Sequence, residues 1–206
     1  WPGPFATDGL GGLSHGATGI GWALSHLDGC DDLAAAAFRY EESLYDPGLP
    51  GWLDMRKPER PTDAAAWCHG AIGIGLVAAD RWRGASDPAT RDHWADVLRR
   101  AAAASWPAGM GANHTLCHGE LGTWELLRAA MDADLAPTEL DPAELDARVL
   151  TGMEEFGAVA GPNRDAFRPG LLLGLGGIGY QLLRMHPQCS LPSVLLPDPG
   201  PPDRIG

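Results

Sequence analysis

Two cysteine–histidine pairs are the residues of this chain with the clearest capacity for chemistry. They are Cys68-His69 and Cys117-His118, and a glycine follows each pair. Thiolates and imidazoles are preferred zinc ligands, and a catalytic zinc site usually has three protein ligands and an open fourth position. Cys68, Cys117 and His118 would supply two sulfur ligands and one nitrogen ligand. The sequence therefore predicts a zinc site whose open position takes water or a substrate, with chemistry directed at a thiol.

Two other interpretations of these residues stay open. Free cysteines are commonly buried, so Cys68 and Cys117 could be core residues beside a satisfied histidine. A structural zinc site would need a fourth protein ligand, for which His114 is the nearby candidate. The same register recurs at both pairs, and this favours the catalytic site because the two thiols would then lie at the same level of neighbouring helices.

Two further histidines could carry protons near such a site. His15 precedes a glycine as His69 and His118 do, but no cysteine stands before it. We therefore expect His15 to face the same cavity without binding the metal, which would suit a general acid or base. A capping or core histidine is the alternative interpretation for His15. His69 could be a second proton carrier across the cavity, or it could form only a local hydrogen bond.

The cysteine–histidine pairs belong to a segment that recurs along the chain. The first glycines of its copies are Gly16, Gly70, Gly119 and Gly174. They are roughly fifty residues apart, a period long enough for two helices and their connections. A second glycine follows three residues later in each copy. Glycines with this spacing lie on one helix face, where they let a neighbouring backbone approach closely.

Each copy leads into an apolar helical stretch, and a more polar helical stretch separates one copy from the next. The apolar stretches are 20–27, 72–79, 121–130 and 178–185, and the polar stretches are 32–44, 90–105 and 139–157. The apolar helices would form an inner ring, and the polar helices an outer layer with Ala-rich faces turned inward. The pattern predicts an all-α fold, an α/α toroid (barrel) of helical hairpins in residues 1–190, with a Pro-rich tail in residues 191–206. We expect this ring to be incomplete, with further hairpins upstream.

The composition limits the classes of partner. The chain is 45% hydrophobic and 20% charged, which is typical of a soluble globular protein. A net charge of -12 argues against nucleic acid as a partner, since phosphate binding needs a basic surface. No apolar run is long enough to span a membrane, and no secretory signal opens the chain. The 4 cysteines are too few for a disulfide scaffold, so we expect a reducing, cytoplasmic compartment.

With these residues in view, the chain resembles the cyclase domain of lanthipeptide synthetases, and in particular the C-terminal part of the fused class II (LanM-type) enzymes. The matching segments are 12–24, 43–47, 52–54, 67–70, 113–119, 169–171, 180–184 and 192–195. The zinc segments and the closing segments are specific to that family, whereas the bare glycine pattern is not.

The resemblance implies a lanthionine-forming cyclase with a central zinc ion held by Cys68, Cys117 and His118. A cysteine of a dehydrated precursor peptide, made of leader and core, would bind at the open position as thiolate and add to dehydroalanine or dehydrobutyrine. The product would be a lanthionine or methyllanthionine thioether ring. His15 matches the family's proposed proton-transfer histidine, and His69 stands where relatives carry His or Tyr. The resemblance also implies an upstream dehydratase domain as partner.

Two departures from the family pattern leave a second function open. Some stand-alone cyclases carry an arginine shortly before the first zinc cysteine, whereas this chain has Ala64, Ala65 and Ala66 there. A family acid contributed by an upstream hairpin lies outside this sequence. The alternative function is therefore a zinc-dependent peptide- or thiol-binding module without turnover, or an inactive fragment. An α/α-toroid hydrolase would need a carboxylate pair near the helix starts, and Glu120 and Glu125 do not form a convincing one.

Overall fold

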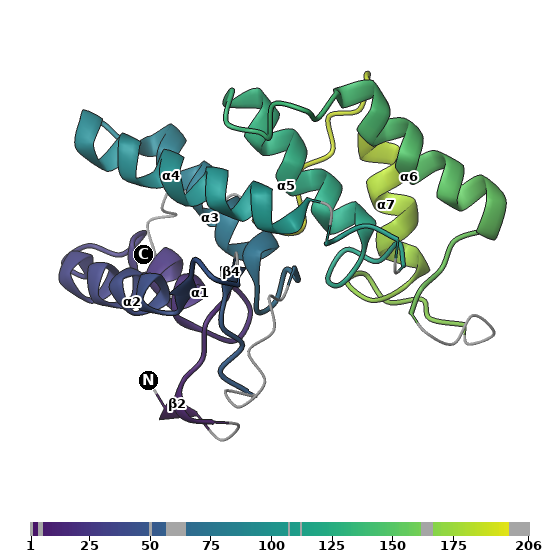
Figure 1. The fold of residues 1–206 in the computed structure, drawn as a ribbon. Helices are drawn as coiled ribbons and strands as arrows, with labels where there is room; N and C mark the ends of the chain where they lie inside the picture. Colours follow the sequence, from purple (N-terminus) through teal and green to yellow (C-terminus); the bar gives the residue numbers. More distant parts are fainter. Residues whose placement is uncertain are drawn as a thin grey trace, which may run out of the picture.

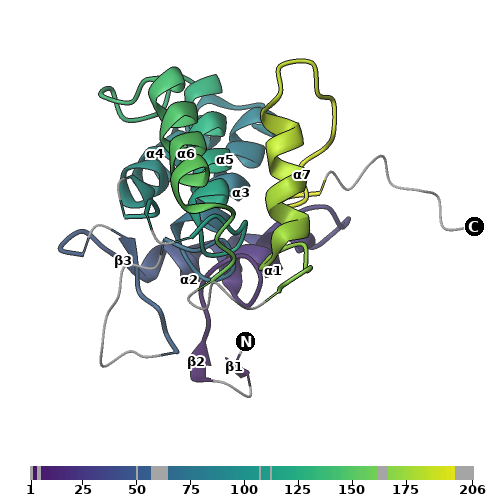
Figure 2. The ribbon, with the colours of Figure 1, turned by 90° about the vertical axis from the view of Figure 1, so that its right-hand side faces the viewer.

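A computed structural model describes residues 2–3, 6–49, 51–56, 65–106, 108–111, 113–161 and 167–197. Helices dominate these residues, in agreement with the predicted all-α class. The helices are α1 (Ala17–Leu24), α2 (Asp31–Ser43), α3 (Ala71–Gly84), α4 (Pro88–Ser105), α5 (Glu120–Asp132), α6 (Pro142–Phe156) and α7 (Leu175–Met185). Two short antiparallel pairs accompany them, β1 (Pro2–Gly3) with β2 (Ala6–Gly9) and β3 (Tyr45–Asp46) with β4 (Gly51–Trp52). The β1–β2 pair projects away from the helices (Figures 1 and 2).

The helices are arranged as the repeats predict, with α1, α3, α5 and α7 inside and α2, α4 and α6 outside. Figure 1 shows the hairpins following one another in chain order, from α1 and α2 at one end to α6 and α7 at the other. Each inner helix contributes side chains to one central cavity of about 550 Å³, among them Trp22, Asp80, Trp124 and Arg184. This shared inner face confirms the α/α toroid. No described helix has the length and apolarity needed to cross a membrane.

Each inner helix starts at the first glycine of its repeat. Gly16, Gly70, Gly119 and Gly174 are the N-caps, all with extended backbones and without a side-chain capping bond. The outer helices α4 and α6 instead begin at Asp-Pro. The carboxylates of Asp87 and Asp141 accept hydrogen bonds from backbone N–H groups of the first turn, and proline follows at the first helical position.

The second glycine of each repeat is required by the loop that precedes its own helix. A Cβ atom on Gly19, Gly73, Gly122 or Gly177 would lie 1.7–2.1 Å from the carbonyl oxygen of the residue six positions earlier. The sequence pattern predicted that these glycines allow the backbone of a neighbouring helix to approach. The nearest backbone is instead that of the loop preceding the same helix. The loop therefore lies flat against the first turn of the helix, where its side chains are held close to the helix start.

The apolar core lies where α3, α4 and α5 meet. Ile72, Leu98 and Leu127 are fully buried there. Ala101 and Ala102 of α4 are also fully buried, so the Ala-rich face of this outer helix is turned inward as predicted. Between α2 and α4, Phe38 packs edge-to-face on Trp94 with ring centroids 4.8 Å apart.

The C-terminal segment returns to the inner helices. Leu195 is fully buried, and its carbonyl oxygen accepts a hydrogen bond of 2.7 Å from Nε1 of Trp67. Ser193 donates a hydrogen bond to Oε1 of Glu125, and Nη1 of Arg184 donates one of 2.6 Å to Oε2 of the same carboxylate. The described part of the predicted tail is thus packed against the helices, while residues 198–206 lie outside the described residues.

Candidate metal centre

A ladder of backbone hydrogen bonds connects the loops that precede the inner helices. Ser14 N–H donates to the carbonyl of Cys68 (2.9 Å), and Trp67 N–H donates to the carbonyl of Cys117 (2.8 Å). Cys117 N–H donates in turn to the carbonyl of Leu172 (3.0 Å). The loops of all the repeats are therefore fixed edge to edge in chain order. This ladder sets Cys68 and Cys117 beside each other, although roughly fifty residues of chain separate them.

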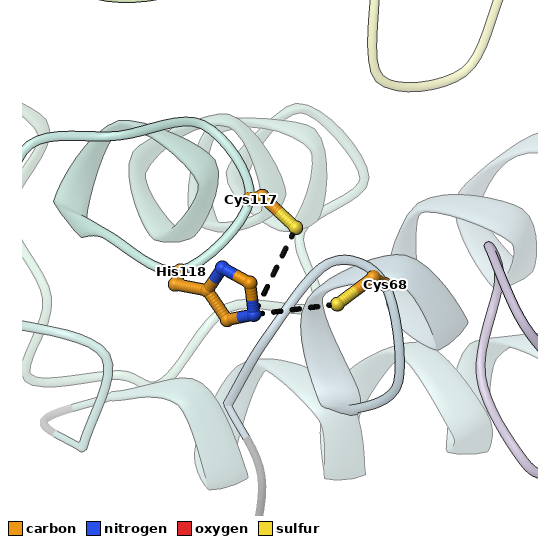
Figure 3. A group of neighbouring side chains, drawn as sticks. All are labelled: Cys68, Cys117 and His118. Carbon is orange, nitrogen blue, oxygen red and sulfur yellow. Dashed lines mark hydrogen bonds between the residues drawn. The ribbon is translucent and has the colours of Figure 1, made fainter. Parts of the chain in front are cut away.

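The side chains of Cys68, Cys117 and His118 point toward one another (Figure 3). Nε2 of His118 lies 3.4 Å from Sγ of Cys68 and 4.0 Å from Sγ of Cys117. All of the possible ligand atoms lie within 4.8 Å of one another. Around a tetrahedral zinc ion with Zn–S of about 2.3 Å and Zn–N of about 2.0 Å, ligand atoms are roughly 3.6–3.8 Å apart. The cluster therefore fits a metal ion with little rearrangement.

The cluster is open on one side. Both cysteines are buried, whereas His118 is exposed. Among the described residues, no fourth histidine, cysteine or carboxylate joins the group. The arrangement is that of three ligands with access for a further one, which is how catalytic metal sites differ from closed structural sites.

His114 occupies a different place from the one that a fourth ligand would need. It is buried, its Nδ1 accepts a hydrogen bond of 2.9 Å from Val159 N–H, and Nε2 lies 3.9 Å from Oε2 of Glu120. The backbone N–H of His114 also donates to the carbonyl of Val159 (2.9 Å). His114 thus connects the loop before α5 to the segment after α6, and it is not a member of the cluster.

The thiols and the imidazole of the cluster perturb one another. A hydrogen bond from Cys117 is the largest influence on Cys68 and lowers the pKa of its thiol, helped by hydrogen bonds from His118 and His69. The same contact raises the pKa of Cys117, and burial raises it further. The hydrogen bond to Cys68 raises the pKa of His118. One thiol of the pair therefore loses its proton more readily than the other, and a metal ion has to displace the proton that remains.

His69 joins the cluster to a carboxylate on a different loop. Its Nδ1 lies 2.9 Å from Sγ of Cys68, and its Nε2 lies 4.0 Å from Oδ2 of Asp54. Arg56 holds that carboxylate with two side-chain hydrogen bonds, Nε to Oδ1 (2.8 Å) and Nη2 to Oδ2 (2.6 Å). Burial raises the pKa of Asp54, but the hydrogen bonds from Arg56 outweigh burial and hold the pKa below its usual value. Asp54 is therefore a stable negative charge beside His69.

Asp54 and Arg56 are residues of this site that the sequence did not reveal. The segment 52–54 is one of those that carry the family resemblance. Its spacing from Cys68 does not predict contact with the loop that contains Cys68. A carboxylate and a guanidinium two residues apart, shortly before the first cysteine, were the available signal. Such a pair is common on protein surfaces, so the signal is weak.

His15 lies at the edge of the same site. It is exposed, and it lines a narrow cleft together with Asp54, Arg56 and His69. On its other side it borders an apolar cavity of about 480 Å³ between α1 and α2. The structure thus brings both predicted proton-transfer histidines to one cleft beside the cluster. Trp22 and Trp124 instead line the central cavity; Nε1 of Trp22 donates to Asp80 of the same cavity, and Nε1 of Trp124 donates to Asp146 of α6.

Comparison with known protein families gives a match over most of the chain. The family model described as lanthionine synthetase C-like protein matches residues 8–196, a range that includes the cluster and all the described helices. No curated protein matches the chain.

Proposed function

Because the chain belongs to the lanthionine synthetase C-like family, we propose that it is a zinc-dependent lanthipeptide cyclase. Its substrate is a dehydrated precursor peptide, with leader and core, that contains a free cysteine and a dehydroalanine or dehydrobutyrine. Its product is the thioether ring of lanthionine or methyllanthionine. The observation that carries this proposal is the convergence of Cys68, Cys117 and His118 on one point that is open to solvent.

The reaction needs an activated thiol and a proton donor. A zinc ion held by Cys68, Cys117 and His118 would lower the pKa of a substrate thiol, and thiolate is the nucleophilic form. Addition forms a carbon–sulfur bond at the β-carbon and breaks the carbon–carbon π bond, whose electrons move onto the carbonyl oxygen as an enolate. The α-carbon then takes up a proton, so the proton that left the thiol is replaced and the peptide mass is unchanged.

The two histidines of the cleft are assigned to the movement of protons. His15 is exposed at the cleft edge, where it can exchange protons with solvent and reach a bound peptide. His69 is held between Cys68 and Asp54, a position from which it keeps the thiolate hydrogen-bonded and can relay a proton across the cleft. Both assignments rest on this shared cleft.

The wider setting follows from the chemistry of the substrate. Dehydroamino acids must be made from serine and threonine before a cyclase can act, so we propose an upstream dehydratase domain in a class II (LanM-type) parent enzyme. All the described cysteines are free, which suits a reducing, cytoplasmic compartment.

The test is ring closure on a dehydrated peptide with one cysteine. Ring closure leaves the peptide mass unchanged but removes its thiol, so alkylation with N-ethylmaleimide followed by mass spectrometry measures the reaction. We expect the zinc-loaded protein to protect the peptide from alkylation, Cys117→Ala to abolish protection, and Cys189→Ala, outside the cluster, to retain it. Undiminished ring closure by Cys117→Ala would refute the proposal. Zinc and peptide binding without loss of the thiol would identify a binding module instead.

A further inference from the structure

We infer that Arg56 is a catalytic residue that donates hydrogen bonds to the oxygen anion formed on the substrate carbonyl when the thiol adds. This inference rests on the proposed function and deepens it, because it assigns a group to the charge that the addition creates. It concerns a residue outside the cysteine–histidine motifs, on the loop that follows β4.

Asp54 fixes the guanidinium of Arg56 in one orientation. The carboxylate accepts from Nε at 2.8 Å, from Nη2 at 2.6 Å and from the backbone N–H of Arg56 at 3.1 Å. A guanidinium carries five N–H donors in a rigid plane, and these two side-chain bonds use one edge of it. Nη1 makes no hydrogen bond with any residue that the structure describes. Its donors are therefore available to a ligand, on a group that is already ordered.

The pair has one buried member and one accessible member. The side chain of Asp54 is 8% exposed, whereas that of Arg56 is 37% exposed. An ion pair that served stability alone would gain little from an arginine at this exposure, since solvent screens such pairs. The buried carboxylate of Asp54 instead fixes the position of the Arg56 guanidinium, which lines the cleft.

Arg56 is a neighbour of the two histidines that are assigned to the movement of protons. It lines the cleft that also contains His15 and His69. The hydrogen bond to Asp54 is the main cause of the raised pKa of Arg56, and the charges of Cys68 and Cys117 raise it further. The guanidinium is therefore within electrostatic range of both cysteines, and a substrate thiol beside them would have its carbonyl group a few bonds away.

The two imidazoles beside the cysteines are already engaged. Nε2 of His118 faces both thiols, and Nδ1 of His69 faces Cys68. Thiol addition places a full negative charge on a carbonyl oxygen, and donors fixed in advance around such an oxygen are often the largest contribution to catalysis. Arg56 is the described cation of this cleft that combines an anchored position with free donors, so the developing charge is best matched there.

A small thiol can test this assignment without ring closure. 3-Mercaptopropionate has the same order of atoms, from sulfur through three carbons to oxygen, as the enolate that forms during addition, and 3-mercaptopropionamide is its neutral counterpart. The affinity of each thiol for the zinc-loaded protein is measured by calorimetry. We expect the wild type to bind the acid about tenfold more tightly than the amide, as a charge-assisted hydrogen bond would give.

Variants then assign the preference to one side chain. Arg56→Gln should bind the two thiols equally, and Arg56→Lys should retain part of the preference because a lysine cannot reproduce the fork of donors. Arg99→Gln removes an exposed positive charge on α4 and should keep the full preference. Ring closure by Arg56→Gln should show a lower kcat at an unchanged zinc content.

The outcomes separate this inference from the proposed function. An unaltered preference in zinc-loaded Arg56→Gln would overturn the role of Arg56 and leave the cyclase proposal standing. A wild type that shows the Arg56-dependent preference but closes no ring would refute the cyclase and confirm Arg56 as an anion-binding residue of a thiol-binding module. A wild type that binds no zinc would overturn both.

Discussion

Gly12 lies directly against the backbone of His69. A Cβ atom on Gly12 would be 2.3 Å from Cα of His69 and 2.8 Å from the carbonyl oxygen of Cys68. Gly12 also has a φ of 91°, a backbone conformation that L side chains rarely adopt. The loop of the first repeat is therefore pressed onto the loop that carries the first cysteine of the cluster, and the shape of that loop depends on this contact.

Gly12→Ala is expected to lower both the stability and the metal affinity. The added methyl group must move the backbone of Cys68 and His69, and the positive φ adds strain of about 1 kcal/mol. We expect a total loss of about 2–4 kcal/mol in the free energy of unfolding by urea, with weaker zinc binding in a competition titration. Gly29→Ala is the matched control, because Gly29 has a φ of 76° and no atom within 4 Å of its added Cβ. Equal losses in both variants would show that the contact with His69 has no effect.

Glu41→Gln should remove a pH dependence of stability. Glu41 is 3% exposed, and its Oε2 accepts from the backbone N–H groups of Gly12 and Thr18 at 2.8 and 3.0 Å. Burial raises its pKa, although these hydrogen bonds oppose the rise. The folded chain thus holds the Glu41 proton to a higher pH than the unfolded chain does. The contribution of Glu41 protonation to the free energy of unfolding is complete below the pKa that Glu41 has in the unfolded chain. It is lost as the pH rises through the pKa of Glu41 in the folded chain.

Urea unfolding of the wild type and of Glu41→Gln from about pH 4 to pH 8 measures this effect. We expect the variant to gain stability relative to the wild type as the pH rises, since a neutral amide can still accept both backbone bonds. Parallel pH profiles for the two proteins would show that Glu41 is not the titrating group.

His114→Ala should reduce stability and leave the metal in place. The substitution opens a cavity and leaves the N–H of Val159 without the imidazole acceptor. We expect the free energy of unfolding to fall by about 2–4 kcal/mol. Zinc per chain, measured by elemental analysis of the folded variant, should stay at the wild-type value. Loss of zinc from a variant that is otherwise as stable as the wild type would favour a four-ligand structural site.

Removal of the metal should destabilise only proteins with an intact cluster. A chelator is expected to lower the melting temperature of the wild type and of Cys30→Ala, because metal bound to the folded state stabilises it by mass action. Cys68→Ala should melt at the same temperature with and without chelator. Differential scanning calorimetry measures these shifts, and a chelator effect that survives in Cys68→Ala would place the metal elsewhere.

The glycine repeat was sufficient to predict the inner helices, because a helix that starts at a glycine before an apolar stretch leaves a signal in adjacent residues. The approach of the two cysteines followed from the same repeat. Asp54 and Arg56 could not be found in this way, since they reach the cleft from an irregular loop whose path depends on tertiary contacts. The positions of Glu41 and His114 were equally hidden, because burial beside a backbone N–H has no periodic signature.

A metal ion bound by the cluster would also make the folding of neighbouring hairpins more cooperative. Each helical hairpin forms from residues that are near in sequence, so its formation carries a small entropic penalty. The cluster instead joins two hairpins, and an ion shared by Cys68 and Cys117 would cross-link the chain across a loop of roughly fifty residues. For a covalent cross-link of that length, the chain-entropy model gives about 4 kcal/mol. The ion would thus cross-link neighbouring hairpins, so that they unfold together as one cooperative unit.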